Sequence, residues 1–194
     1  MYVVLLDSSN TSLTVGLANE TGVLESVSYE AWQSQSEHMV PELDKLLNKY
    51  NVSYKDISDV VTSIGPGSYT GVRIAITIAK TIAVATGANL YGISSLRCQK
   101  DRKNPSICLI NARSGRSYFG VFEDEKVIVD DTILTNDKVL EYIKNHPNYS
   151  VCGNASYLGL DGVEPDIARE LFALMKCSSP VKDPLALKPV YMKD

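Results

Sequence analysis

The sequence predicts an α/β fold made of two similar lobes, the second smaller than the first. The chain opens with short apolar strands joined by tight turns, and the same arrangement returns after residue 106. Between the two, the apolar run 60–64 passes through a glycine-rich bend into a long apolar helix. The charged stretch 100–105 predicts a boundary between an N-terminal lobe, 1–103, and a smaller C-terminal lobe, 104–194.

The first lobe is predicted to begin as an antiparallel meander. Residues 2–7 form an apolar strand, 13–18 alternate as a returning strand, and 23–29 follow a Glu-Thr-Gly turn. Asp7 ends the first strand, and Ser8 and Ser9 follow it. The residues alone favour a turn-capping role for this acid.

Residues 34–50 are predicted to form an amphipathic helix that Asn51 ends. Met39, Leu43 and Leu46 recur at helical spacing and define its apolar face. His38 has no companion at metal-ligand spacing, so a partly exposed histidine is expected.

The glycine-rich bend after the strand 60–64 is a candidate anion loop. Gly65, Gly67 and Gly71 permit backbone shapes closed to other residues, and Ser68 is a natural helix cap. Backbone N–H groups at such a bend suit an anion. The glycine spacing is one residue longer than the dinucleotide fingerprint, and no Lys-Ser or Lys-Thr follows, which excludes a P-loop. A tight turn is the favoured interpretation of the glycines. The residues that would hold a nucleotide or anion are Asp7, Ser8, Ser9, Gly65, Gly67 and Ser68.

The helix 70–86 is apolar on almost every side, which predicts burial on more than one face. One face can pack on the sheet, and the other needs a second domain or another chain. We favour another chain, because the alanines let a partner helix approach closely. Arg73 lies in the first helical turn, where a cation opposes the helix dipole, so it is expected to have an acidic partner or ligand.

The second lobe repeats the strand-turn-strand theme at 107–111, 117–122 and 126–129. Helices are predicted at 136–144 and 165–176, a strand at 149–152, and an extended stretch at 188–191.

Composition narrows the function classes. The net charge is −4, which argues against a protein that binds nucleic acid unaided. No apolar run reaches the length of a membrane span, and no basic leader precedes the first strand, so a cytoplasmic protein is expected. The four cysteines, without a C-x-x-C pair, are expected to be buried thiols that neither pair nor bind a metal.

The sequence resembles the TsaB (YeaZ-type) family of bacterial proteins needed to make threonylcarbamoyladenosine in tRNA. The resemblance is carried by Gly-Pro-Gly-Ser-Tyr-Thr-Gly-Val-Arg at 65–73, Leu-Asp-Ser-Ser at 6–9, Gly-Ile-Ser-Ser-Leu at 92–96 and Asn-Ala-Arg at 111–113. It runs from residue 1 to about 125 and returns at 188–191, whereas 135–183 match poorly. Asn111 stands where the family usually has Asp.

The resemblance implies the actin-like ATPase fold (ASKHA, RNase H-like), in which a strand-end acid such as Asp7 faces nucleotide phosphate and metal. It also implies a non-catalytic partner of the paralogue TsaD, working with the ATPase TsaE. TsaD holds its metal with an H-x-x-x-H motif, and the corresponding residues 94–98 here read Ser-Ser-Leu-Arg-Cys. No catalytic residue, metal or cofactor of its own is therefore expected.

Family members pair with TsaD through helices that correspond to 36–50 and 70–86. ATP or ADP near that junction, a homodimer through the same helices and only indirect contact with tRNA are further expectations. The residues expected at the partner interface are Met39, Leu43, Leu46, Tyr69, Arg73, Ile74, Ile78 and Ile82.

Two other functions stay open. An actin-fold phosphotransferase would use Asp7 and the glycine bend, but it needs a catalytic base in a second lobe that looks slight. The second alternative is a glycoprotease-like peptidase, but the sequence contains no G-x-S-x-G elbow, no metal motif and no Ser-His-Asp set that would support it.

Overall fold

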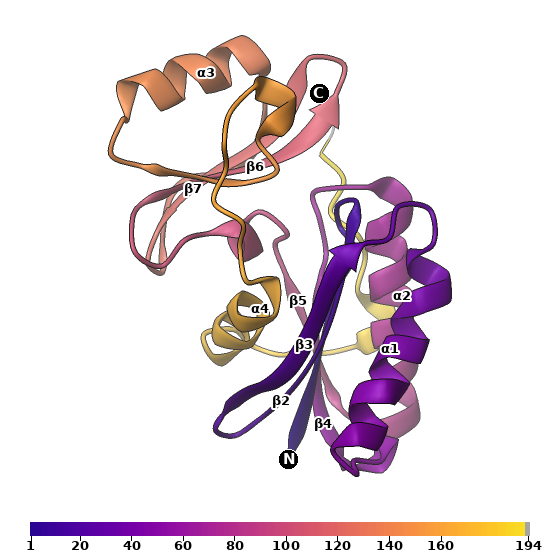
Figure 1. Ribbon diagram of the computed structural model, residues 1–194. Helices are drawn as coiled ribbons and strands as arrows, with labels where there is room; N and C mark the ends of the chain where they lie inside the picture. Colours follow the sequence, from indigo (N-terminus) through magenta and orange to yellow (C-terminus); the bar gives the residue numbers. More distant parts are fainter. Residues whose placement is uncertain (193–194) are drawn as a thin grey trace.

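The computed structural model describes residues 1–192 and confirms the two-lobed α/β fold (Figure 1). A five-stranded sheet in the first lobe has the order β3-β2-β1-β4-β5, and a four-stranded sheet in the second has the order β8-β7-β6-β9. The first sheet contains β1 (Tyr2–Asp7), β2 (Ser12–Asn19), β3 (Gly22–Glu30), β4 (Ile57–Ser63) and β5 (Asn89–Ile93). The second contains β6 (Ser106–Arg113), β7 (Arg116–Glu123), β8 (Lys126–Thr135) and β9 (Ser150–Gly153).

The two sheets share one topology. In the first, β1, β2 and β3 form the expected antiparallel meander, while β4 pairs parallel with β1 and β5 parallel with β4. In the second, β6, β7 and β8 repeat the meander and β9 pairs parallel with β6. The counterpart of β5 is only an isolated parallel bridge between Cys152 of β9 and Val163, so the second lobe is reduced, as predicted.

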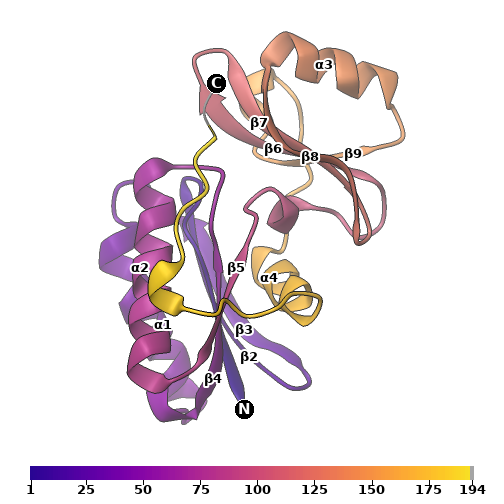
Figure 2. The ribbon, with the colours of Figure 1, turned by 180° about the vertical axis from the view of Figure 1, so that it is seen from behind.

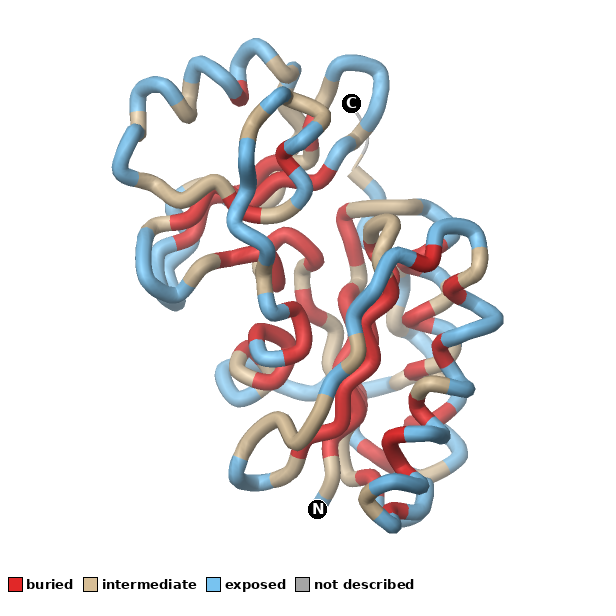
Figure 3. Tube along the Cα trace, in the orientation of Figure 1, coloured by how far each residue is buried: buried red, intermediate tan, exposed pale blue. Residues whose placement is uncertain are grey.

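Two helices cover one face of the first sheet (Figures 1 and 2). They are α1 (Gln35–Lys49) and α2 (Tyr69–Thr86). Successive strand residues point to opposite faces, so Val4 and Leu6 pack toward these helices while Val3 and Leu5 face the other way. The buried centre of this sheet is the red core of Figure 3.

The opposite face is covered by a helix that follows the second lobe in sequence. This helix, α4 (Ile167–Lys176), places Ala168 and Leu171 against Val3 and Leu5 of β1. The prediction that 104–194 form one lobe is therefore wrong for residues from 167 onward. The apolar side of α4 is buried on the open face of the first sheet, whereas α3 (Asn136–Asn145) covers the second sheet.

The C-terminal segment, residues 181–192, runs along α2 (yellow in Figure 2). The Val181 N–H donates to the carbonyl oxygen of Leu90 at 2.8 Å, and the Lys80 Nζ donates to that of Leu185 at 2.9 Å. The extended stretch 188–191 is confirmed, and its Val190 N–H donates to the Ile64 carbonyl oxygen at 2.7 Å. The chain itself therefore covers part of the α2 face for which we expected a partner.

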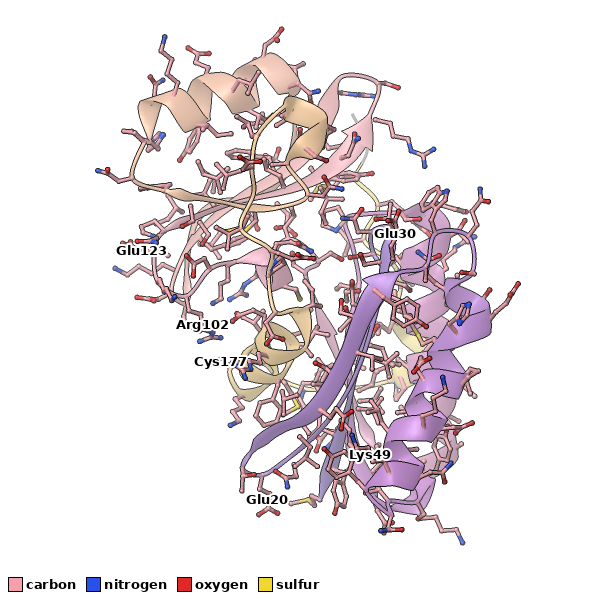
Figure 4. All side chains as sticks on the ribbon, viewed as in Figure 1. Glu20, Glu30, Lys49, Arg102, Glu123 and Cys177 are labelled. Carbon is pink, nitrogen blue, oxygen red and sulfur yellow. The ribbon has the colours of Figure 1, made fainter. Side chains whose placement is uncertain are left out.

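The cysteine prediction holds for three residues of four. Cys98, Cys108 and Cys152 are buried, but Cys177 is exposed just beyond the end of α4 (Figure 4).

Candidate functional site

The loop after β1 and the glycine bend before α2 pack backbone against backbone. The Ser8 hydroxyl donates to the Gly71 carbonyl oxygen at 2.7 Å, and the Ser68 N–H donates to the Ser9 carbonyl oxygen at 2.7 Å. A Cβ atom added at Gly71 would lie 1.9 Å from the Ser8 carbonyl oxygen, and one at Gly67 would lie 2.2 Å from that of Ser9. Glycine is required at both positions because the two loops approach so closely.

Several N–H groups of the candidate anion loop already have partners within the chain. The Gly71 N–H donates to the Ser68 hydroxyl at 3.2 Å, which confirms Ser68 as the helix cap. The Gly65 N–H donates to the Ser95 hydroxyl at 3.0 Å. The structure thus brings together the six residues predicted for this loop, and most of their contacts hold the loop after β1 against the glycine bend. They are Asp7, Ser8, Ser9, Gly65, Gly67 and Ser68. Anion binding by this loop stays a prediction.

Asp7 borders an acidic cavity between the lobes. Its carboxylate accepts a hydrogen bond from the Ser9 N–H at 3.2 Å and is buried. Burial raises the pKa of the Asp7 carboxyl, and the hydrogen bond from the Ser9 N–H together with the neighbouring hydroxyls of Ser63 and Ser9 opposes this shift. The cavity has a volume of about 470 Å³. Its lining includes four acids, Asp7, Glu30, Asp161 and Glu164, and no Lys or Arg; Glu30 is at the upper end of β3 in Figure 4.

A second cavity of about 730 Å³ opens between the lobes beside the start of α2. Trp32 and Tyr69 line it from the first lobe, and Asn111, Arg113 and Tyr118 from the second. The Arg113 guanidinium lies 5.6 Å from the centre of the Trp32 ring system, a cation–π contact that spans the two lobes. This lining contains aromatic rings and one cation but no carboxylate.

Four of the residues expected at a partner interface are in the chain's own core. Met39, Leu43, Leu46 and Ile82 are buried between the helices and the sheet, so we correct their assignment. Helical periodicity identified an apolar face correctly, but that face packs on the chain's own sheet.

The other four expected interface residues reach the surface to different degrees. Tyr69 and Arg73 are exposed, whereas Ile74 and Ile78 are half-buried and pack against the core. On the same side of α2, the exposed residues Thr77, Thr81 and Val84 extend this surface toward the end of the helix. These three residues were not predicted from the sequence as part of the interface, although they recur on α2 at the spacing of one helix face.

Arg73 stacks on aromatic rings. Its guanidinium carbon lies 4.3 Å from the centre of the Tyr69 ring and 5.9 Å from that of Tyr191. The two tyrosine rings stack on each other with centres 5.1 Å apart. Within residues 1–192 no carboxylate pairs with Arg73, so the acidic partner expected for it stays a prediction.

A cluster of charges joins the two lobes at the segment that connects them. The Arg102 guanidinium, beside α4 in Figure 4, donates to both carboxylate oxygens of Glu170 at 2.5 and 3.1 Å. The Lys100 Nζ, which is almost fully buried, donates to the Asp124 carbonyl oxygen at 2.6 Å. Glu170 belongs to α4 and Asp124 to the turn between β7 and β8, so the segment that connects the lobes is tied to both.

The residues at 94–98 make internal contacts. The Ser94 hydroxyl donates to the Asp131 carboxylate at 2.6 Å, the Ser95 hydroxyl accepts from the Gly65 N–H, and Cys98 is buried. Among the described residues, no three His, Cys, Asp or Glu side chains cluster as metal ligands. No helix in that part of the chain is long and apolar enough to cross a membrane.

Comparison with known proteins gives consistent results. The family model for TsaD, tRNA N6-adenosine threonylcarbamoyltransferase, matches residues 22–156. The chain is 31% identical to the tRNA threonylcarbamoyladenosine biosynthesis protein TsaB of Bacillus subtilis over 146 residues, 71% of this chain and 64% of that protein. It is 30% identical to TsaB of Buchnera aphidicola subsp. Baizongia pistaciae over 188 residues, 88% of this chain and 80% of that protein.

Among solved structures, YeaZ from Pseudomonas aeruginosa superposes with a TM-score of 0.81 at 19% identity, covering 98% of this chain and 99% of that one. At this identity the likeness shows that the fold is shared.

Proposed function

The chain belongs to the TsaB family of tRNA threonylcarbamoyladenosine biosynthesis proteins, and on this premise we propose that it is a non-catalytic subunit that pairs with TsaD and activates it. TsaD is then the enzyme that transfers the threonylcarbamoyl group to the adenosine beside the anticodon of tRNAs that read ANN codons. In this proposal the assembly works in the cytoplasm with the ATPase TsaE. It reaches tRNA only through TsaD.

The exposed face of α2 carries the proposal. Its exposed row follows helical spacing through Thr70, Arg73, Thr77, Thr81 and Val84, with the half-buried Ile74 and Ile78 beside it, so small and β-branched side chains make up most of this face and Arg73 is its one fully exposed charge. Val84 is 55% exposed, although most side chains of α2 are apolar, as in a helix buried in a protein core. β-Branched and small side chains of this kind let a helix of another protein pack closely.

The residues that would perform chemistry in a transferase have structural roles here. Ser94 and Cys98 stand where the resemblance places the two metal-binding histidines of TsaD; the Ser94 hydroxyl is hydrogen-bonded to Asp131, and Cys98 is buried. These contacts favour a partner protein over a second transferase.

The phosphotransferase alternative is disfavoured by the cavity beside Asp7. A nucleoside triphosphate placed there would meet four carboxylates and no lining Lys or Arg, so its phosphates would need a bound cation to offset the repulsion. If ATP or ADP binds near the junction with TsaD, the second cavity suits it better. Trp32, Tyr69 and Tyr118 offer rings for a base, and Arg113 offers a charge for phosphate.

The first test is an omission assay with purified TsaC-type synthase, TsaD, TsaE, tRNA, ATP, threonine and bicarbonate, with and without this protein. The proposal predicts that modified tRNA forms only when the protein is present, and that the protein alone neither hydrolyses ATP nor cleaves peptides. Equal product without it would refute the role as an activating subunit.

A matched pair of variants tests the docking face. Val84→Asp introduces a charge at the α2 face, and Val127→Asp introduces the same charge on β8, where Val127 is 46% exposed. We expect Val84→Asp to abolish TsaD binding while the fold remains intact, and Val127→Asp to bind as the wild type does. Undisturbed binding by Val84→Asp would exclude this face.

A further inference from the structure

The acidic cavity beside Asp7 has walls from both lobes. β2 and β3 form one wall, and residues 153–167 form the other. Backbone contacts hold the second wall together. A Cβ atom added at Gly162 would lie 2.4 Å from the Gly153 carbonyl oxygen, and the Gly153 N–H donates to the Val163 carbonyl oxygen at 3.1 Å. The cavity is therefore a built part of the fold, and its volume of about 470 Å³ is in the range of small-molecule sites.

The Asp7 carboxylate lines this cavity without a cationic partner. Asp7 is only 4% exposed. Its Oδ1 atom accepts a hydrogen bond from the Ser9 N–H, whereas its Oδ2 atom accepts none from the described residues. No Lys or Arg in residues 1–192 forms an ion pair with it. Because a buried carboxylate is normally paired with a cation or saturated with hydrogen bonds, Asp7 has capacity for a cationic ligand.

Three further carboxylates line the cavity, and all three belong to exposed residues. They are Glu30, labelled in Figure 4, Asp161 and Glu164. With no Lys or Arg in the lining, the four acids together attract cations. Among the described residues, however, no three acids converge as metal ligands. The negative charges are spread over the lining, which suits a ligand with several separated positive charges better than a single ion.

The rest of the lining is neutral. Leu160, Pro165 and Ile167 contribute apolar surface, and Tyr29 contributes a ring on which an ammonium group can bind. An ammonium group donates three hydrogen bonds and accepts none, so carboxylate and amide oxygens, such as that of Asn10, are its natural partners. Methylene groups between the ammonium groups of a ligand would contact the apolar side chains.

We propose that this cavity binds a linear organic polycation, in which protonated amines are spaced along a methylene chain, and that Asp7 receives one of these amines. The exposed carboxylates of Glu30, Asp161 and Glu164 bind the others. This site goes beyond the proposed function, since it requires neither TsaD nor tRNA.

Titration calorimetry of the isolated full-length protein with spermidine, at fixed ionic strength, tests the proposal. Spermidine should bind one to one. Asp7→Asn keeps the shape of the side chain and should weaken binding by about tenfold or more, because a close and desolvated charge pair is lost. Glu164→Gln, at an exposed carboxylate, should weaken it by about two- to fivefold. The control Glu123→Gln, at the end of β7 and outside the lining, should bind as the wild type does (Figure 4).

Thermal unfolding provides a second readout. Spermidine should raise the melting temperature of the wild type and of Glu123→Gln, but not that of Asp7→Asn, because a ligand stabilises only the form that binds it.

Two results would overturn the proposal. If spermidine does not bind the wild type at millimolar concentration, or if Asp7→Asn binds it as tightly as the wild type, the cavity is not a polycation site. If Mg²⁺ binds the wild type more tightly than spermidine and Asp7→Asn abolishes both, the site takes a divalent cation and the assignment to an organic polycation is wrong. Neither result depends on TsaD, so the proposed function is tested separately.

Discussion

Replacing Gly71 by Ala tests the packing of the loop after β1 on the start of α2. The new Cβ would lie 1.9 Å from the Ser8 carbonyl oxygen, whereas an ordinary contact between carbon and oxygen needs about 3.3 Å. Both groups belong to the backbone, so neither can rotate away. The loops must separate by more than ~1 Å, which breaks the hydrogen bond from the Ser8 hydroxyl to Gly71.

The expected loss follows from three contributions. Overpacking costs about 1–3 kcal/mol, and the lost hydrogen bond costs about 1 kcal/mol. The higher helix propensity of alanine stabilises the helix by about 1 kcal/mol and offsets part of this loss. The free energy of unfolding should fall by about 1–3 kcal/mol, and the melting temperature by about 3–10 °C for a chain of this length. Calorimetric unfolding measures both quantities.

The control for this prediction is Thr70→Ala, at the neighbouring exposed position of the same helical turn. It also places alanine in the first turn of α2 but removes exposed side-chain atoms and adds none against the backbone, so it should leave the melting temperature within a few degrees of the wild type. If Gly71→Ala proved as stable as Thr70→Ala, the close approach of the two loops would be refuted.

Three further predictions concern the charge cluster, the buried acid and the thiols. Glu170→Gln removes the charge that pairs with Arg102 beside the buried Lys100, and it should lower the free energy of unfolding by about 1–3 kcal/mol. The control Glu125→Gln changes a half-exposed carboxylate and should lower it by less than about 1 kcal/mol. Equal losses in chemical denaturation would contradict this. Because burial raises the Asp7 pKa above 3.8, the folded state binds the proton more tightly, so stability should fall as pH rises from 3.8 through the raised pKa. Asp7→Asn should therefore melt above the wild type at neutral pH, and the gap should narrow toward pH 3.8; a gap that does not depend on pH would refute the assignment. A thiol reagent added to the native protein should label Cys177 quickly and Cys98, Cys108 and Cys152 only on unfolding, and Cys177→Ser should abolish the fast phase.

Local patterns in the sequence were sufficient to predict most helices and strands. Period-two and helical spacing predicted the meanders, α1, α2 and α4, and the motif at 65–73 predicted where a strand gives way to a helix. The same patterns do not specify what covers each apolar face. Met39 and Leu43 have the spacing of a buried face whether the burying surface is the chain's own sheet or another protein.

The long-range contacts were beyond such reasoning. The amphipathic pattern of α4 is compatible with either lobe, and only the complete fold places Leu171 on β1. The extended stretch 188–191 was predicted from sequence, but its position along α2 depends on pairing with Ile64 and Tyr69, far away in the chain. The role of Gly67 and Gly71 as sites of backbone contact with Ser9 and Ser8 likewise needed the folded structure.

Amide hydrogen exchange of the protein with and without TsaD tests the central claim most directly. The account predicts that TsaD slows exchange in α2, and that the second sheet and α3 exchange at unchanged rates. Protection confined to the second lobe or to the cavity beside Asp7, with α2 unaffected, would contradict it.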